Sequence, residues 1–288
     1  MQTVPPRFTL AHLRAARTEG TKIPMLTCYD FTTAKLMQQA GVQTLLVGDS
    51  AANVILGHPT TLPVPLSFMV QIAAAVRRGA PAAFVVADMP FGSYGGSLGT
   101  SVANVCRMVR RSGCDCVKLE VADGHESLVR ALADMGVAVM AHLGLRPQSV
   151  STLGGYKVQG RTAEQAKQIV QTARTMERAG AVAILLEAVP DEVGAAVVAA
   201  TSLPVIGCGA GPSCHGYVFV THDAVGLSDH VPRFAPKLGD LATPTVECYR
   251  RYVQQVTDRQ YPAAEHGYPM PAAEREAFER DANQEKPF

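Results

Sequence analysis

The sequence has 288 residues, of which 47% are hydrophobic and 18% charged, and its formal net charge at pH 7 is +1. A chain of this length suits one large domain near the size of an α/β barrel, and its balanced charge argues against nucleic-acid or membrane partners, so we expect a small-molecule partner. No apolar run is long enough to span a bilayer, residues 1–24 lack the apolar segment of a secretory signal, and seven irregularly spaced cysteines indicate reduced thiols, which together predict a cytoplasmic protein.

Short apolar runs alternate with segments of helical periodicity along the chain, which is typical of repeated βαβ units. The runs predict eight strands, at Met25–Cys28, Thr44–Gly48, Ala83–Ala87, Cys116–Leu119, Ala138–Ala141, Ala183–Leu186, Pro204–Gly207 and Tyr217–Val220. The predicted helices are Thr32–Ala40, Leu66–Arg78, Thr100–Ser112, Gly124–Met135, Ala163–Ala179, Asp191–Ala199 and Thr243–Val256. Eight such units favour an α/β fold closed as a (β/α)8 (TIM) barrel over an open sheet.

The barrel is expected to form a single catalytic domain over residues 1–266. The tail from Asp258 is rich in Pro, Ala, Glu and Arg, and we expect it, over 267–288 outside the catalytic domain, to be a surface extension or partly disordered. A glycine closely follows each of five predicted helices, which predicts left-handed helix ends at Gly41, Gly79, Gly113, Gly136 and Gly180.

Polar residues stand at the carboxyl ends of the predicted strands: Asp49, Ser50, Asp88, Lys118, Glu120, His142 and Glu187. In a barrel these ends converge on one face, where such enzymes build their active sites. Each residue alone has a structural explanation, such as a helix cap, a turn or an ion pair. Four carboxylates around one cleft repel one another, however, and would be costly without a cation among them.

The set therefore predicts a divalent metal ion, with Mg2+ preferred over zinc because the central ligands are carboxylates. A metal bound there can chelate the carboxylate and keto oxygens of a 2-oxo acid and acidify the hydrogen on the next carbon. Enolisation then needs one base, for which a carboxylate outside the metal shell would serve.

The chain resembles the 3-methyl-2-oxobutanoate hydroxymethyltransferases, also called ketopantoate hydroxymethyltransferases, from about Lys22 to about His266. The matching stretches are Met25–Asp30, Leu46–Ser50, Thr61–Val64, Ala75–Pro81, Val117–Glu120, His142–Leu145, Pro147–Ser149, Gly154–Arg161, Leu186–Glu187, Pro204–Gly207, Gly209–Gly211, His222–Asp223, Tyr261–Pro262 and Glu265–His266. Long blocks in one order are far more specific than a short motif.

The resemblance implies Mg2+-dependent transfer of a one-carbon unit from 5,10-methylenetetrahydrofolate to 3-methyl-2-oxobutanoate, which gives 2-dehydropantoate for pantothenate and coenzyme A. By matching positions, it implies Asp49 and Asp88 as metal ligands, with Glu120 at or next to the metal shell. It further implies substrate contacts at Asp49, Ser50, Asp88, Lys118 and His142, and Glu187 as the base that removes the C3 proton. The family's barrels assemble into decamers, so a homo-oligomer is the implied state.

Three stretches depart from the family pattern. The family usually has Leu-Gly-Met at Ala51–Asn53, Tyr-His-Thr at Gln71–Ala73, and Cys-Asp-Gly-Gln at Cys214–Tyr217. They leave the exact 2-oxo acid acceptor and one-carbon donor open, and we expect the donor pocket near Ile72 and His215–Tyr217. Neutral drift in a family member is the simpler explanation of the departures.

Three other functions remain as alternatives. The first is a paralogue with a different acceptor or donor. The second is an enzyme of the isocitrate lyase and phosphoenolpyruvate mutase superfamily, but the Lys-Lys-Cys-Gly-His type motif of those enzymes is absent. The third is a non-catalytic homologue, which the retained Asp49, Asp88 and Glu187 disfavour.

Overall fold

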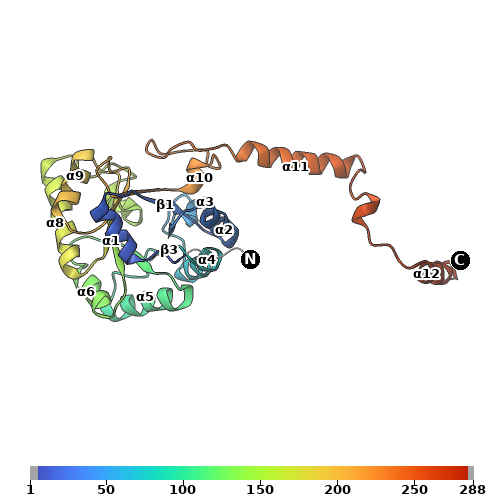
Figure 1. The fold of residues 1–288 in the computed structure, drawn as a ribbon, viewed down its shortest axis with the longest axis horizontal. Coiled ribbons are helices and arrows are strands. Elements are labelled where there is room, and N and C mark those ends of the chain that lie inside the picture. Colours follow the sequence, from blue (N-terminus) through green and yellow to red (C-terminus); the bar gives the residue numbers. More distant parts are fainter. Residues whose placement is uncertain (1–5, 285–288) are drawn as a thin grey trace. The chain divides into compact units, whose positions relative to one another are not determined.

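The computed structural model describes residues 6–284 and divides the chain into two compact units, Met1–Leu238 and Gly239–Phe288. The first unit holds the sheet and the helices that surround it (Figure 1). The extent of the catalytic domain, residues 1–266, stays a prediction.

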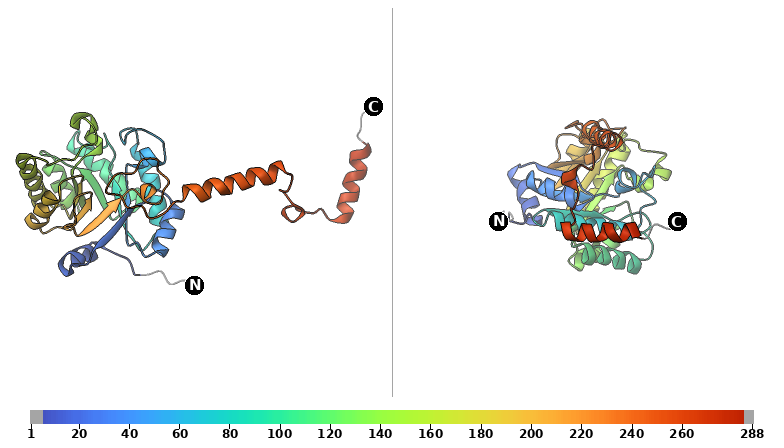
Figure 2. Two further views of the ribbon diagram at one scale, coloured as in Figure 1. Left: turned by 90° about the horizontal axis from the view of Figure 1, so that it is seen from above. Right: turned by 90° about the vertical axis from the view of Figure 1, so that its right-hand side faces the viewer.

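Eight parallel strands form a closed barrel, in which each strand pairs with its neighbours in sequence and β8 pairs with β1. This confirms the predicted (β/α)8 fold. Figure 2 shows the strands enclosed by the helices of this unit. The strands are β1 (Ile23–Thr27), β2 (Thr44–Val47), β3 (Phe84–Asp88), β4 (Cys116–Glu120), β5 (Val139–Gly144), β6 (Ala183–Glu187), β7 (Val205–Cys208) and β8 (Gly216–Phe219).

Two hydrophobic layers hold the barrel together, because successive side chains on each strand point to opposite faces of the sheet. One layer fills the barrel interior and includes Met25, Leu46, Phe84, Val86, Cys116, Met140, Leu185 and Ile206. The other lies between the sheet and the helices and includes Leu45, Val85, Val117, Leu119, Ile184 and Val205. Strands buried on both faces explain the continuous apolar runs in the sequence.

The longer helices of this unit follow the strands as the periodicity predicts. They are α2 (Phe31–Gln39), α4 (Leu66–Gly79), α5 (Leu98–Ser112), α6 (Glu126–Asp134), α8 (Ala163–Ala179) and α9 (Asp191–Ala200). Short additional helices, which the sequence did not predict, lie in the loops: α3 (Ala51–Val54), η1 (Pro147–Ser149), α7 (Val150–Leu153) and α10 (Thr221–Ala224).

One predicted helix end is wrong. Gly79 is the last residue of α4 and is not left-handed, whereas Gly41, Gly113, Gly136 and Gly180 have φ values between 70° and 102°. The absence of a side chain at Gly79 serves packing instead, since a Cβ there would lie 2.3 Å from the Phe31 carbonyl oxygen of α2.

An unpredicted helix, α1 (Leu10–Glu19), closes the amino-terminal end of the barrel. Its buried Leu13 and Ala16 belong to the interior layer. Arg17 donates a hydrogen bond to the Thr201 carbonyl just before β7, and the Phe8 amide donates to the Ala82 carbonyl just before β3. The strands' amino-terminal ends are therefore covered, which leaves their carboxyl ends for a site.

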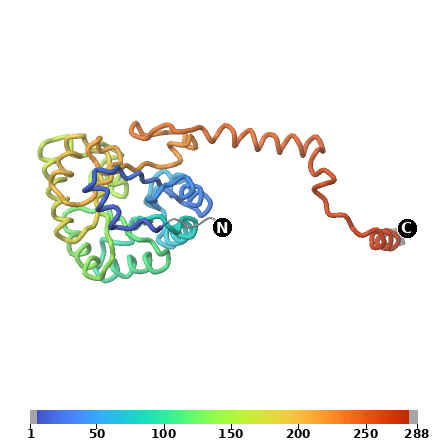
Figure 3. Tube along the Cα trace, in the orientation of Figure 1, coloured from blue at the N-terminus to red at the C-terminus, as the bar shows by residue number. Residues whose placement is uncertain are grey.

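The second unit contains α11 (Ala242–Thr257), η2 (Ala264–His266) and α12 (Ala272–Gln284), which can be followed in the trace of Figure 3. The tail thus differs from the expectation in one respect, because most of its described part is helical. Ala, Glu and Arg are strong helix formers, so this segment can form a helix although it contributes few core residues. No helix among the described residues is both long and apolar enough to cross a membrane.

Candidate functional site

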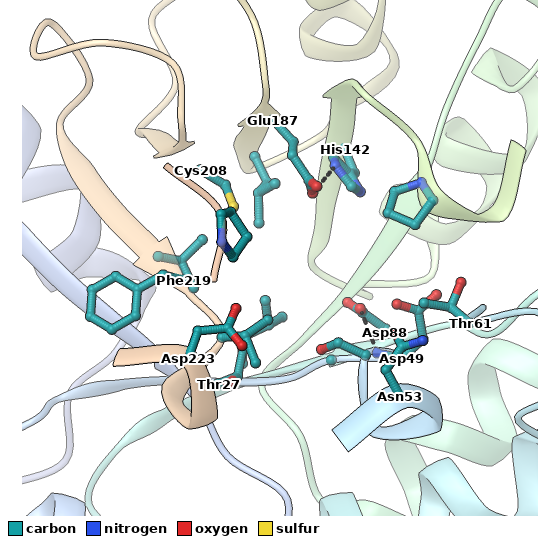
Figure 4. A pocket seen from close by; sticks show the side chains of 18 of the residues that line it. Thr27, Asp49, Asn53, Thr61, Asp88, His142, Glu187, Cys208, Phe219 and Asp223 are labelled. Atoms are coloured by element: carbon teal, nitrogen blue, oxygen red, sulfur yellow. Dashed lines mark hydrogen bonds and ion pairs between the residues drawn. The ribbon is translucent and has the colours of Figure 1, made fainter. Parts of the chain in front are cut away.

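The polar residues predicted from the strand ends converge at the carboxyl end of the barrel. A cavity of about 650 Å³ opens there, and its lining includes Asp49, Ser50, Asp88, Lys118, His142 and Glu187. Glu120 does not line this cavity, although its side chain is buried next to it. Figure 4 shows Asp49 and Asp88 on one side of the cavity and Glu187 beside His142 on another.

The two-residue period of the strands places these groups. On β4, Cys116 points into the apolar barrel interior, so Lys118 and Glu120 share its face nearer the carboxyl end. On β5, Met140 and His142 follow the same rule. Both strands therefore supply an apolar side chain to the barrel interior and polar side chains nearer the carboxyl end.

Two glycines allow the strand ends to approach closely. A Cβ at Gly48 would lie 2.7 Å from Ser50 Oγ, so this position keeps the turn into Asp49 and Ser50 compact. At Gly144, where φ is +86°, a Cβ would lie 2.2 Å from the Glu187 carbonyl oxygen. Glycine at the end of β5 thus permits the pairing that brings Glu187 alongside His142.

Asp49 and Asp88 form the centre of the acidic side. The Asp49 amide donates to Asp88 Oδ2 at 3.0 Å, and Lys118 Nζ lies 3.1 Å from the same oxygen. Asp88 Oδ1 is buried and has no hydrogen-bond partner among the described residues. Burial raises the pKa of Asp88 to about 7, with Lys118 opposing the rise and Asp49 adding to it.

Gln148, which site prediction from the sequence missed, ties this centre to Glu120. Its side-chain Nε2 donates to Asp49 Oδ2 at 2.8 Å and to the Met89 carbonyl at 3.0 Å. Its backbone amide donates to both carboxylate oxygens of Glu120. The Tyr94 hydroxyl donates to Gln148 Oε1, which fixes the amide with its nitrogen towards Asp49. The resemblance contained Gln148 within Pro147–Ser149 but gave no reason to single it out.

Glu120 is the most perturbed of these carboxyl groups. Burial, followed by repulsion from Asp49, raises its pKa to about 9, although Lys118 and the Gln148 amide oppose the rise. Lys118 is also buried, which disfavours its charge, but the surrounding carboxylates, Asp88 first, raise its pKa above the usual value. One ammonium among several carboxyl groups leaves the acidic side short of positive charge.

His142 connects Lys118 to Glu187. Its Nδ1 lies 3.0 Å from Lys118 Nζ, and its Nε2 lies 3.2 Å from Glu187 Oε2 without an aligned hydrogen bond. Burial and the Lys118 charge lower the pKa of His142 well below its usual value, so the ring is neutral. Because an ammonium can only donate, Nδ1 accepts and Nε2 carries the hydrogen that faces Glu187.

Glu187 is the carboxyl group best suited to accept a proton. Burial raises its pKa to about 7, with Lys118 opposing the rise. Its side chain keeps 19% of its surface exposed to the cavity, whereas Asp88 and Glu120 are almost fully covered. A base whose pKa lies near neutral pH and which reaches an open cavity has the properties that general-base catalysis needs.

Ser50 lies at the edge of the acidic side, where its Oγ is 2.8 Å from the Tyr29 hydroxyl. Burial raises the pKa of Tyr29 well above its usual value, so the phenol stays protonated and can donate to Ser50 or to a ligand.

The donor chemistry of the acidic side fits a hard divalent cation. The unpartnered Asp88 Oδ1 and the raised pKa values of Asp88 and Glu120 indicate uncompensated negative charge. No group of three or more His, Cys, Asp or Glu side chains is arranged to hold a metal ion within residues 6–284. Both carboxylate oxygens of Glu120 accept from the Gln148 amide, whereas Asp49 and Asp88 each keep one carboxylate oxygen that accepts no hydrogen bond from the described residues.

The structure corrects the expected donor pocket. His215 and Tyr217 stand at the amino-terminal end of β8, where the Ile23 amide donates to the His215 carbonyl, and neither lines the cavity. Ile72 lies on α4 and packs against the helical layer. Among the three departures, only Ala51–Asn53 reaches the cavity, through Asn53. The sequence pattern does not distinguish these positions from those at the carboxyl ends of strands, where the cavity lies.

Comparison with known proteins identifies close relatives in sequence. Residues 7–264 match the family described as Ketopantoate hydroxymethyltransferase. The chain is 45% identical over 260 residues to a 3-methyl-2-oxobutanoate hydroxymethyltransferase of Geobacillus kaustophilus, with 90% of this chain and 92% of that protein covered. A protein of the same name from Frankia alni is 44% identical, with 91% and 86% covered.

Solved structures with the same fold are more distant in sequence. A phosphoenolpyruvate phosphomutase of Streptomyces platensis subsp. rosaceus superposes with a TM-score of 0.60 at 14% identity, covering 96% of this chain and 98% of that one. A 2,3-dimethylmalate lyase, of the PEP mutase/isocitrate lyase superfamily, gives 0.56 at 19% identity, with 98% and 100% covered. At such identities the likeness establishes the barrel fold and leaves the reaction to be argued from the site.

Proposed function

Since this chain belongs to the ketopantoate hydroxymethyltransferase family and is therefore a transferase, we propose that it transfers a hydroxymethyl group from 5,10-methylenetetrahydrofolate to 3-methyl-2-oxobutanoate. The product is 2-dehydropantoate, a precursor of pantothenate, and the reaction requires Mg2+. The observation that carries this proposal is the placement of Glu187, a base with a pKa near 7, in one cavity with the Asp49 and Asp88 pair.

Asp49 and Asp88 hold the metal ion in this proposal. A Mg2+ ion held by these two carboxylates would supply Lewis-acid polarisation of the 2-oxo acid, which would acidify the hydrogen on C3. Gln148 orients Asp49 through one carboxylate oxygen and leaves the other free. Lys118 holds Asp88 in the same way, so that Oδ1 remains available.

Glu187 removes the C3 proton. His142 Nε2 lies 3.2 Å from Glu187 Oε2, and Lys118, 3.0 Å from Nδ1, fixes the tautomer of His142. C3 then forms a bond to the methylene carbon of the folate, the two C–N bonds of that methylene break, and a water molecule supplies the hydroxyl oxygen. The proton taken from C3 and one proton of the water replace the methylene on the two folate nitrogens, so tetrahydrofolate leaves and atoms and charge balance.

The experiment that tests the proposal combines the purified protein with 3-methyl-2-oxobutanoate, Mg2+ and 5,10-methylenetetrahydrofolate and identifies the product by mass spectrometry. We expect 2-dehydropantoate and tetrahydrofolate in equal amounts. Failure to form either, by protein that is folded by circular dichroism, would contradict the proposal.

The metal assignment has a test of its own. Asp49→Asn and Asp88→Asn should each weaken Mg2+ binding by at least about tenfold, measured by isothermal titration calorimetry, and lower activity in parallel. Asp134→Asn, which changes an exposed carboxylate at the end of α6, is the matched control. Full activity of both site variants in the presence of a chelator would exclude the metal site.

A paralogue with a different 2-oxo acid acceptor is the second candidate. Asn53 lines the cavity at a position where the family usually has methionine, and its Nδ2 donates to the His58 carbonyl. A polar group there alters the wall near Asp49. The test is the turnover of a panel of 2-oxo acids by the wild type and by Asn53→Met. A paralogue would turn over another 2-oxo acid faster than 3-methyl-2-oxobutanoate, and Asn53→Met should reduce that preference.

We propose further that the protein assembles into a homo-oligomer, a decamer by resemblance to the family. Helix α11 supports association, because its own unit buries none of its residues and leaves several large apolar side chains exposed: Val246, Tyr249, Tyr252, Val253 and Val256. Light scattering coupled to size-exclusion chromatography measures the mass of the assembly, and a monomer at micromolar concentration would contradict this.

A further inference from the structure

The cavity has a second end that the proposed chemistry of the acceptor does not use. Glu187, Asp49 and Asp88 account for the proton transfer and the metal. Thr27, Cys208, Phe219, Asp223 and Phe234 also line the same cavity, and Figure 4 shows Asp223 beside Thr27, on the side opposite Asp49. A cavity of about 650 Å³ accommodates much more than a small 2-oxo acid.

Asp223 is the polar residue at this second end. Asp223 is only 8% exposed, and Figure 4 shows its side chain pointing into the cavity. Within the part of the chain that the structure describes, its carboxylate takes part in no hydrogen bond or ion pair. A carboxylate that faces the cavity without a partner from the protein has both oxygens available to accept hydrogen bonds, so its placement points to a ligand with hydrogen-bond donors.

The backbone around Asp223 is fixed rather than free to turn away. The Thr221 amide donates to Thr27 Oγ1 at 2.8 Å, and Thr221 Oγ1 donates to the Thr27 carbonyl at 2.7 Å. This double contact joins the start of α10 to the end of β1, and the Asp223 amide donates to the Val220 carbonyl. The carboxylate is therefore presented to the cavity by a rigid support.

Aromatic surface lies at the same end. Phe219, the last residue of β8, and Phe234 both line the cavity. Phe234 packs against Gly209, where an added Cβ would lie 2.6 Å from its ring. A carboxylate combined with aromatic side chains suits a flat heterocycle that has N–H groups at its edge.

We propose that this second end binds the pterin ring of the folate donor, with Asp223 as the residue that recognises it. The 2-amino group and the adjacent ring N–H of a pterin are neighbouring donors, and they match the two oxygens of one carboxylate. The inference rests on the proposed function, which names a folate as the donor. It places the donor and the acceptor in one cavity, with Glu187 lining it as well.

The test measures donor affinity and acceptor activation separately. Binding of tetrahydrofolate is measured by calorimetry in the presence of Mg2+ and 3-methyl-2-oxobutanoate, for the wild type, Asp223→Asn and Asp229→Asn. Asp229 is exposed, lies in the loop after α10 and does not line the cavity, so its variant is the matched control. Exchange of the C3 hydrogen in deuterated water, without folate, is measured for each protein.

For Asp223→Asn, we expect the loss of tetrahydrofolate affinity to exceed any loss of exchange rate by at least about tenfold, because one charged hydrogen bond is removed. A folate analogue without the 2-amino group should bind the wild type more weakly than tetrahydrofolate does. Asp223→Asn should weaken binding of this analogue less than it weakens binding of tetrahydrofolate. Equal tetrahydrofolate affinity of wild type and Asp223→Asn, with exchange intact, would overturn the role of Asp223 alone. A wild type that exchanges C3 but binds no tetrahydrofolate would instead overturn the folate donor of the proposed function, and this inference with it.

Discussion

The barrel interior changes character along each strand, and its two ends can be compared on the same elements. On β4, Cys116 packs among apolar side chains near α1, whereas Lys118 and Glu120 on the same face lie among charges. The amino-terminal end buries hydrophobic surface and stabilises the fold. The carboxyl-terminal end buries charges and opposes folding, as the raised pKa values of Asp88, Glu120 and Glu187 indicate.

The difference between the two ends predicts different consequences of mutation. A change at the amino-terminal end should alter stability and leave the chemistry of each folded molecule intact. A change at the carboxyl-terminal end should alter chemistry and leave stability unchanged or improved, because a buried carboxylate is removed.

The largest effect is expected from Glu187→Gln at the carboxyl-terminal end. Loss of a general base should slow exchange of the C3 hydrogen of 3-methyl-2-oxobutanoate in deuterated water by roughly a hundredfold to ten-thousandfold. Nuclear magnetic resonance measures this exchange with Mg2+ present and folate absent. Glu192→Gln, which changes an exposed residue in the first turn of α9, is the control.

The pH dependence of exchange sharpens the same prediction. Glu187 must be ionised to accept a proton, and burial raises its pKa to about 7. The exchange rate of the wild type should therefore rise with pH up to about 7 and level off above it, and Glu187→Gln should lack this rise. An unchanged rate in the variant would show that the base is misassigned.

The second prediction concerns stability at the amino-terminal end. Leu13→Ala removes a side chain of α1 that is 1% exposed and should lower the free energy of unfolding by about 2–5 kcal/mol. Leu10→Ala, at a partly buried position of the same helix, should cost less. Chemical denaturation measures both. A large fall in exchange rate per folded Leu13→Ala molecule would break the separation between the two ends.

A smaller effect is expected at Gln148. Gln148→Met keeps the size of the side chain but removes the donor to Asp49, so Mg2+ affinity should fall by roughly tenfold to a hundredfold. Gln168→Met removes a comparable amide contact to Asp123, away from the acidic side, and should leave Mg2+ affinity unchanged. If both variants bind Mg2+ as the wild type does, Gln148 has no part in positioning the ligands.

The smallest effect is expected from truncation after Met270, which removes α12 from the second unit. The described residues of this helix are largely exposed, Phe278 among them, so the truncated chain should fold and turn over normally. Thermal unfolding and product formation check this. Loss of solubility or of the oligomeric state would show that the tail packs against a neighbouring subunit.

The alternation of apolar runs and helical segments was sufficient to predict the eight strands, because parallel strands buried on both faces leave a distinct signature. Helix α1 was not predicted, since its charged sequence shows a weak apolar face. The residues at strand ends were identifiable because a barrel brings all carboxyl ends to one face.

Only the tertiary structure determined the role of each of those residues in the site. The sequence identified Lys118, His142 and Glu187 as members of one site, but only the 3.0 and 3.2 Å contacts fix the histidine tautomer. It could not single out Gln148 or Asp223, because an amide or a lone carboxylate has no periodic signature. Their roles depend on distances between strands far apart in sequence, which hydrogen-bond geometry and packing determine only once the barrel has closed.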